Sequence, residues 1–139
     1  MSVDSAGMAA RLGIKPGMVV QELGWDEDAD EDLRDAVIDL SGGEMVDEDT
    51  DEVADIVLLW WREDDGDLVD ALVDAIGALG EDGVVWLLVP KSGRPGHVEP
   101  GDVTEAAPTA GLSQTSSISA AKDWSGIRLV TPKAARTRR

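Results

Sequence analysis

Uninterrupted apolar runs and helical stripes alternate along most of this chain. The run ADIVLLWW spans residues 54–61 and the run GVVWLLV spans residues 83–89, and neither alternates with polar residues. A strand that is covered on both faces has this pattern, and such strands belong to parallel sheets. A shorter strand is predicted at residues 18–23, after the turn formed by residues 15–17. The pattern therefore predicts a sheet whose central strands are buried.

Between these strands, apolar residues recur with the spacing of amphipathic helices. The first helix is predicted over residues 30–40 and ends at Ser41-Gly42-Gly43, and its apolar stripe consists of Leu33, Ala36, Val37 and Leu40. Asp67 can cap a second helix, whose apolar side carries Leu68, Leu72, Ala75, Ile76 and Leu79. A third helix is predicted over residues 102–110, where Pro108 is expected to shorten or kink it.

Two further strands, at residues 114–121 and 126–130, are predicted to form a terminal hairpin around the turn at residues 122–125. A short strand at residues 44–46 precedes an acidic loop at residues 47–52. Alternating strands and helices favour parallel pairing with right-handed crossovers. We therefore predict an α/β fold: a mostly parallel sheet with helices on both faces and a C-terminal antiparallel β-hairpin.

The length of 139 residues indicates one domain. We predict a flexible segment at residues 1–12, a single α/β domain at residues 13–132 and a basic tail at residues 133–139. No apolar run is long enough to span a bilayer, and no apolar signal region is found at the start. Cysteine is absent, so disulfides and thiolate sites are excluded. A cytoplasmic location without a membrane partner is therefore expected.

Charge is distributed unevenly along the chain. Residues 1–89 hold 25 acidic and 4 basic side chains, a net charge of −21, whereas residues 90–139 hold 4 acidic and 8 basic ones, a net charge of +4. The acidic part argues against direct binding of DNA or RNA by the main body. It suits a basic protein partner, whose approach would be steered electrostatically, although solubility alone also explains it. The oligomeric state is not specified by the sequence.

Two resemblances to known families follow from these features. The order of elements, ending in an antiparallel hairpin, is similar to that of the class I methyltransferases, which implies a Rossmann-like, methyltransferase-like fold. More specifically, four motifs resemble a family of small uncharacterised actinobacterial proteins, a domain of unknown function. These motifs are VVQELGWDED, VLLWWREDDGDLVDAL, VVWLLVPKSGRPGHVEP and KDWSG. The second resemblance implies one domain and brings no activity with it.

The turn after the first strand is where a Rossmann-like methyltransferase holds its cofactor, since backbone amides of a glycine-rich turn must approach the ligand. Here only Gly24 is present, and the bulky Trp25 follows it. Six carboxylates occupy residues 26–32. We therefore predict that no cofactor is bound and that the site is degenerate. If a cofactor is retained, the residues expected to contact it are Gly24, Trp25 and Glu48, the last of which could meet a ribose hydroxyl.

Metal binding and catalysis find little support in the sequence. The acidic series that start at Asp26 and at Asp47 imitate calcium loops, but both lack the glycine and glutamate such loops require, so no metal site is predicted. A single histidine, His97, cannot form a multi-histidine site. It lies with Lys91 and Arg94 in a glycine-containing loop at residues 90–100, which could bind a partner.

All five large aromatic side chains of the chain are tryptophans. Trp60 and Trp61 are adjacent at the end of a predicted strand, so they should point to opposite faces of the sheet. They can be core residues, or at least one can be a partly exposed partner contact. Trp124, in the predicted hairpin turn, can likewise be a core residue or a partner contact.

The leading hypothesis is a non-catalytic acidic domain that acts by protein–protein interaction with a basic partner, in a regulatory or adaptor role. Its expected contacts are Trp25, Asp28, Asp30, Glu31, Trp60, Trp61, Arg62, Lys91, Arg94, His97 and Trp124. The alternative is a small-molecule binding protein or methyltransferase that uses the cleft at the strand carboxyl ends, with S-adenosylmethionine or a nucleotide as its ligand. A second alternative is a DNA mimic, whose carboxylates take the place of phosphates.

Overall fold

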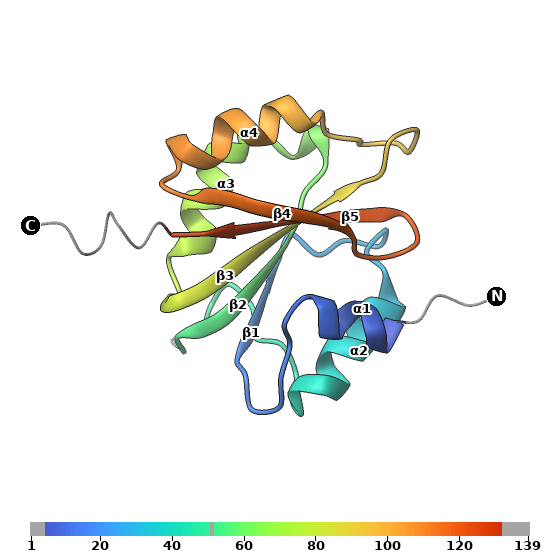
Figure 1. Ribbon diagram of the computed structural model, residues 1–139, viewed down its shortest axis with the longest axis vertical. Coiled ribbons are helices and arrows are strands. Elements are labelled where there is room, and N and C mark those ends of the chain that lie inside the picture. The colour runs from blue at the N-terminus through green and yellow to red at the C-terminus, as the bar shows by residue number, and fades with distance from the viewer. Residues whose placement is uncertain (1–4, 51, 132–139) are drawn as a thin grey trace, which may run out of the picture.

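The computed structural model describes residues 5–50 and 52–131, which form a five-stranded sheet with the strand order β1-β2-β3-β5-β4 (Figure 1). The strands are β1 (Val20–Leu23), β2 (Ala54–Trp60), β3 (Leu79–Pro90), β4 (Ser113–Ser119) and β5 (Trp124–Val130). The first three are parallel, and the hairpin of β4 and β5 joins β3 in antiparallel fashion. The predicted mixed α/β sheet with a terminal hairpin is confirmed.

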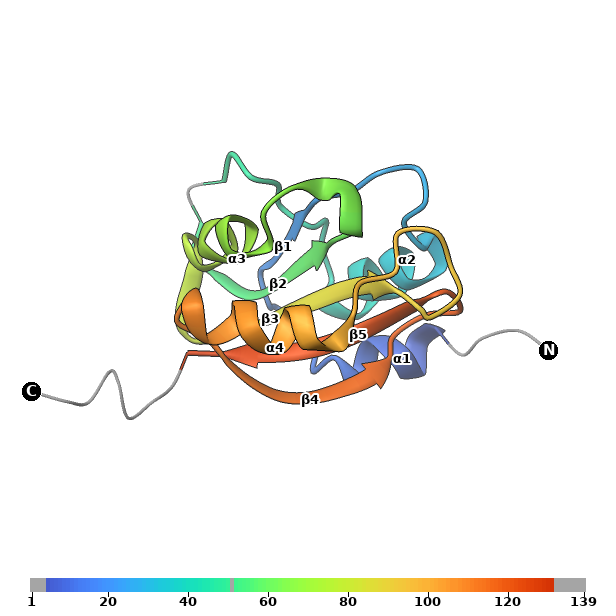
Figure 2. The ribbon, with the colours of Figure 1, turned by 90° about the horizontal axis from the view of Figure 1, so that it is seen from above.

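Helices cover both faces of this sheet (Figure 2). Helices α1 (Ser5–Arg11) and α2 (Glu31–Ser41) pack on one face, and α3 (Leu68–Ile76) and α4 (Pro100–Thr109) pack on the other. A short 3₁₀ helix, η1 (Glu63–Asp65), follows β2. In the described part of the chain, no helix is long and apolar enough to cross a membrane. The cytoplasmic location stays a prediction.

The strand β2 explains how one sequence run builds two cores. Its side chains alternate between the faces, so Ile56 and Leu58 join the core beneath α1 and α2, while Val57 and Leu59 join the core beneath α3 and α4. The same alternation puts Trp60 in the first core and leads to Trp61 in the second. The prediction that these two indoles lie on opposite sides of the sheet is confirmed.

Local signals define the start and the end of α2. The Asp30 side chain accepts a hydrogen bond from the Leu33 amide at 2.8 Å, which is an N-cap, and Gly42 ends the helix with a φ of 89°. Asp67 caps α3 in the same way, accepting from Val69 at 2.9 Å. Helix α4 begins at Pro100 and contains Pro108 close to its end, so this proline falls in the last turn.

Three segments differ substantially from the prediction, while the other predicted ends differ from the structure by one or two residues at most. Residues 44–46 form only an isolated bridge, from Val46 to Gln21, since so short a segment between glycines and acidic residues buries little surface. Helix α3 ends at Ile76, because Leu79 pairs with Ala54 and opens β3 four residues before the predicted start.

The third difference concerns the predicted flexible segment at residues 1–12. Residues 5–11 form α1, which packs on α2, and both Ala9 and Leu12 are buried in the core. The Leu12 carbonyl also accepts a hydrogen bond from the buried Trp86 indole at 2.8 Å. Residues 5–12 are therefore part of the folded body, because Ala9 and Leu12 pack in the core beside α2, while residues 1–4 lie outside the described residues. The predicted basic tail at residues 133–139 lies outside the described residues.

Candidate functional site

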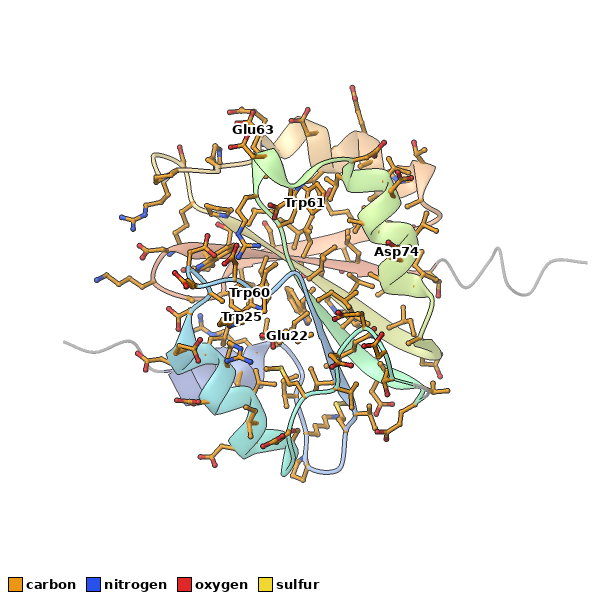
Figure 3. The ribbon with its side chains drawn as sticks, turned by 180° about the vertical axis from the view of Figure 1, so that it is seen from behind. Glu22, Trp25, Trp60, Trp61, Glu63 and Asp74 are labelled. Atoms are coloured by element: carbon orange, nitrogen blue, oxygen red, sulfur yellow. The ribbon has the colours of Figure 1, made fainter. Side chains whose placement is uncertain are left out.

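The motif residues singled out in the sequence converge at the carboxyl ends of β1 and β2. Figure 3 shows Glu22 and Trp25, from β1 and the turn after it, beside Trp60 from the end of β2. Trp61 follows Trp60 but points toward α3. In an open α/β sheet this edge is where ligands bind, so the contacts made here determine which functions are available.

Gly24 allows the end of β1 to approach β2 very closely. Its φ is 75°, in the left-handed region that side chains avoid, and a Cβ built on it would lie 2.3 Å from the Trp60 carbonyl oxygen. The glycine is therefore required by the packing of the two strand ends. This role accounts for its presence without a cofactor.

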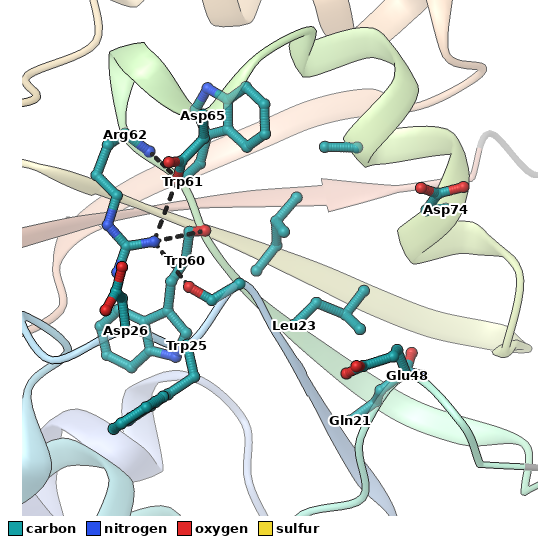
Figure 4. A pocket seen from close by; sticks show the side chains of 13 residues that line it. Gln21, Leu23, Trp25, Asp26, Glu48, Trp60, Trp61, Arg62, Asp65 and Asp74 are labelled. Carbon is teal, nitrogen blue, oxygen red and sulfur yellow. Dashed lines mark hydrogen bonds and ion pairs between the residues drawn. The ribbon is translucent and has the colours of Figure 1, made fainter.

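Arg62 closes the gap beside Gly24 (Figure 4). Its guanidinium donates to the Gly24 carbonyl at 2.7 Å, to Asp65 at 3.2 Å and through two nitrogens to Asp28. The side chain is 12% exposed, so the cation is largely enclosed by its acceptors. The hydrogen bond from Arg62 holds the pKa of the Asp28 carboxyl below its ordinary value, outweighing the opposite effect of burial. The charge of Arg62 is therefore already compensated.

Trp60 and Trp124 are core residues that support this arrangement. They pack edge to face with ring centroids 4.8 Å apart, and Arg62 lies 5.2 Å above the Trp124 ring. The Trp60 indole donates to Glu22 at 2.9 Å, and the Trp124 indole donates to the Asp28 carbonyl at 3.2 Å. Both side chains are buried, so neither is the exposed partner contact that the sequence analysis considered.

Trp61 requires the same correction, because it is 6% exposed and packs in the core beneath α3 and α4. Trp25 is the tryptophan that remains accessible, with half of its surface exposed. Its indole donates to Glu31 at 3.3 Å, and the Arg34 guanidinium lies 5.7 Å from the ring centroid. Trp25 is therefore turned toward α2. The group that fills the space beside Gly24 is Arg62, and not the indole that the sequence suggested.

Glu22 is a central residue of this edge that the sequence analysis did not select. It binds the Arg34 guanidinium through two hydrogen bonds, of 2.6 and 2.8 Å, and it also accepts from Trp60. Glu31 accepts from Arg34 at 2.9 Å, and these bonds raise the pKa of the guanidinium further. A carboxylate within a predicted buried strand was the available signal, since such a group needs a buried partner.

A cavity of about 600 Å³, here called the edge pocket, opens between the end of β1, the loop after residue 46 and α3. Its walls include Leu23, Trp61 and Ala71, with Gly24, Trp25 and Glu48, the three residues expected at a retained cofactor site. Four carboxylates line it, those of Asp26, Glu48, Asp65 and Asp74. Arg62 is the cation among its lining residues, and two carboxylates already bind it.

The basic loop does not reach the edge pocket. Lys91 donates to Ser119 at 2.6 Å, Arg94 pairs with Asp123 at 3.2 Å, and the His97 Nδ1 lies 2.9 Å from the Pro90 carbonyl. His97 instead lines a separate cavity of about 170 Å³ beside α4 and the hairpin. Within residues 5–50 and 52–131, no cluster of three metal-ligating side chains is found.

The remaining predicted contacts, Asp28, Asp30 and Glu31, all have structural partners. Asp28 binds Arg62, Asp30 caps α2, and Glu31 accepts from Trp25 and Arg34. Asp28 and Glu31 are nonetheless exposed, and both belong to the acidic surface around Trp25. The structure therefore brings Trp25 and the acidic residues to one edge and places the other tryptophans inside.

Comparison with known proteins identifies relatives without an assigned activity. The model of a family described as "Protein of unknown function (DUF3052)" matches residues 9–133. Uncharacterized proteins of Mycobacterium bovis and Mycobacterium tuberculosis are 58% identical over 129 residues, which cover 93% of this chain and 81% of each relative. The predicted resemblance to an uncharacterised actinobacterial family is thereby confirmed.

Several solved structures with a similar fold are described as methyltransferases. A SAM-dependent methyltransferase from Aquifex aeolicus superposes with a TM-score of 0.64 at 13% identity, covering 93% of this chain and 90% of that one. Magnesium protoporphyrin IX methyltransferase from Synechocystis, with bound SAM, gives a TM-score of 0.55 at 11% identity, covering 91% and 76%. At this identity the likeness concerns the fold alone, which is methyltransferase-like and Rossmann-like as predicted.

Proposed function

We propose that this chain, which belongs to the DUF3052 family of proteins of unknown function, is a non-catalytic recognition domain that binds a basic protein at the acidic edge of its sheet. One observation carries the proposal. The two arginines of this edge are each held by two carboxylates, Arg34 by Glu22 and Glu31, and Arg62 by Asp28 and Asp65. The charges left over at the edge pocket are negative.

Glu48 and Asp74 supply this free negative charge. Both are exposed, both line the edge pocket, and neither side chain has a hydrogen-bond or ion-pair partner within the described residues. A cationic partner would gain their attraction without displacing an internal ion pair. By contrast, an anionic ligand such as a nucleotide would face carboxylates with no uncompensated cation among the lining residues. The half-exposed Trp25, which also lines the pocket, adds an aromatic surface of the kind enriched at interfaces.

The binding test uses a fluorescein-labelled lysine-rich peptide and fluorescence anisotropy. We expect the double variant Glu48→Gln with Asp74→Asn to bind this peptide more weakly than the wild type. The matched control is Glu52→Gln with Asp70→Asn, which removes the same charge from the same loop and the same helix. Equal weakening by both pairs would show that only net charge matters, and absence of binding by the wild type would reject the proposal.

A second candidate function is S-adenosylmethionine binding, which the position of the edge pocket favours. The pocket lies at the carboxyl ends of the strands with Gly24 and Glu48 in its lining, and a structural neighbour is described with bound SAM. The carboxylates suit the ammonium and sulfonium groups and the ribose hydroxyls of this ligand. Its own carboxylate would lack a counterpart, because Arg62 is engaged by Asp28 and Asp65. The residues present thus fit the ligand only in part, and we derive no methyl transfer from them.

Tryptophan fluorescence distinguishes the two candidates, since Trp25 lies in the pocket lining. Titration with S-adenosylmethionine, with a thermal melt in parallel, is expected to give no saturable change. A saturable response at micromolar concentrations that Glu48→Gln weakens would favour the second candidate. Duplex DNA is left out of both tests, because this polyanion binds a lysine-rich peptide without sequence preference and would remove it from the protein in every case.

A further inference from the structure

The edge pocket contains a buried hydrogen-bond acceptor that no part of the described chain satisfies. Gln21, on β1, is 4% exposed and lines the pocket. Its Nε2 donates to the Asp47 carbonyl at 3.0 Å, which fixes the orientation of the amide. The Oε1 atom has no hydrogen-bond partner within the described residues. Buried polar atoms are nearly always paired, so this acceptor indicates a missing donor.

The surroundings of Gln21 specify what kind of donor is missing. Asp47, its partner, precedes Glu48, and Figure 4 shows Gln21 and Glu48 on one wall of the pocket while Asp74 projects from α3. An incoming group would therefore meet one neutral acceptor and two unpaired carboxylates. Leu23 and Ala71 also line the pocket and contribute apolar surface. A cation with several N–H donors and a long apolar stem matches this combination.

We infer that the edge pocket binds an arginine side chain of the basic partner. This inference rests on the proposed function and names the residue type that the site selects. A planar guanidinium has five donors in a fixed geometry, so it can donate to a neutral acceptor such as Gln21 and to a carboxylate of the pocket at once, whereas an ammonium is a compact point charge with three donors. The methylene stem of arginine covers apolar surface such as that of Leu23 and Ala71.

Trp25 supports arginine over lysine by a separate contact. Arg34 already lies over the indole at 5.7 Å, and the side chain nevertheless remains half exposed. Trp25 is among the lining residues of the pocket, and a half-exposed indole can stack on a guanidinium plane. The chain itself pairs arginine with tryptophan twice at this edge, since Arg62 lies over Trp124 at 5.2 Å.

The test uses two labelled peptides of equal net charge that differ at one position. Both are lysine-rich, and the central residue is arginine in one and lysine in the other, with a citrulline peptide as the uncharged comparison. We expect the arginine peptide to bind wild-type protein about tenfold more tightly than the lysine peptide, the size of effect of a charged hydrogen bond. The citrulline peptide should bind no better than the lysine peptide.

Variants of the protein then show which residues produce the preference for arginine over lysine. Gln21→Leu removes the acceptor and should reduce the preference for arginine to about twofold or less, while binding of the lysine peptide changes little. Asp74→Asn, at an exposed position, should reduce it as well, whereas Asp70→Asn on the same helix should not. The Asp74 variant decides the matter if Gln21→Leu fails to fold.

The outcomes separate this inference from the proposed function. If the two charged peptides bind wild-type protein equally well, the arginine pocket is rejected while recognition of a basic partner stands. A preference that survives both Gln21→Leu and Asp74→Asn would likewise reject the pocket. If neither charged peptide binds, both the inference and the proposed function are rejected.

Discussion

At the scale of single residues, Gly24 is the position where the fold is least tolerant of change. Gly24→Ala would place a Cβ 2.3 Å from the Trp60 carbonyl and would force a side chain into a φ of 75°. We expect a loss of about 3 kcal/mol or more in the free energy of unfolding, since backbone strain and steric overlap add. Urea denaturation followed by tryptophan fluorescence measures it.

Gly101→Ala provides the matched control. Gly101 lies in the first turn of α4, its φ is not in the left-handed region, and a Cβ there meets nothing within 4 Å. The same substitution should therefore leave stability unchanged or raise it by up to about 1 kcal/mol, because alanine restricts the unfolded chain. Equal effects of the two substitutions would contradict the close approach of β1 and β2.

The ion pair of Asp28 with Arg62 predicts a specific pH dependence. The pKa of Asp28 is depressed in the folded protein, so its contribution is present above the ordinary carboxyl pKa and is lost as pH falls through the folded value. At neutral pH, Asp28→Asn should lower the free energy of unfolding by less than about 1 kcal/mol, since the carboxylate is half exposed. The difference from wild type should shrink as the pH falls below about 4 and vanish only below the depressed pKa of the folded protein.

Urea unfolding at several pH values, for wild type and variant in parallel, measures this difference. Asp35→Asn removes an equal charge from an exposed position on α2 and serves as the control. A gap between wild type and Asp28→Asn that stays constant down to acidic pH would show that the pair contributes nothing through ionisation.

At the scale of elements, the contribution of Asp30 as the N-cap of α2 can be measured separately from its contribution to the acidic surface charge. Asp30→Ala should cost about 1 kcal/mol because the Leu33 amide loses its acceptor, whereas Asp30→Asn should cost little, since asparagine caps equally well. Thermal or urea unfolding of the two variants measures the cap. Equal losses would point to charge rather than capping. Binding tests of the acidic edge should therefore avoid Asp30.

The strands and most helices could be predicted because each carries its own signal. Residues 56–61 and 84–89 are all apolar, which is typical of a strand covered on both faces, and Asp67 marks the start of α3. The predictions failed where the pairing between strands determines the secondary structure. Leu79 fits the stripe of α3, but it pairs with Ala54 in the sheet. The register of β2 and β3 shifts between Ala54 and Ile56, and such a shift depends on both strands, so neither segment alone predicts it.

The candidate site could be predicted in position but not in its internal contacts. Gly24 and Trp25 are found at the expected edge, because the end of a first strand is fixed by topology. That Arg62 reaches Asp28, and that Trp124 packs on Trp60, depends on residues far apart in the chain. That the Gln21 Oε1 atom lacks a hydrogen-bond donor can be recognised only when the positions of all its described neighbours are known.

At the scale of the whole molecule, the net charge of −17 predicts that salt stabilises the fold. Carboxylates crowd the start of α2, the loop before β2 and the 3₁₀ helix η1, where they repel one another. Raising NaCl from about 50 mM to about 500 mM shortens the Debye length to a few ångströms and screens this repulsion. We expect the Tm to rise. A fall would mean that the ion pairs of Arg34 and Arg62 dominate the electrostatics.

The same charge distribution makes a kinetic prediction about partner binding. Long-range attraction acts on the encounter, so the association rate of the arginine peptide should fall steeply with salt while its dissociation rate changes little. Asp39→Asn, near the end of α2, should slow association only, because Asp39 is exposed and does not line the pocket. Asp74→Asn should in addition speed dissociation, because it removes a short-range contact. Stopped-flow anisotropy measures both rates, and identical effects of the two variants would assign all binding to the overall field and none to the pocket.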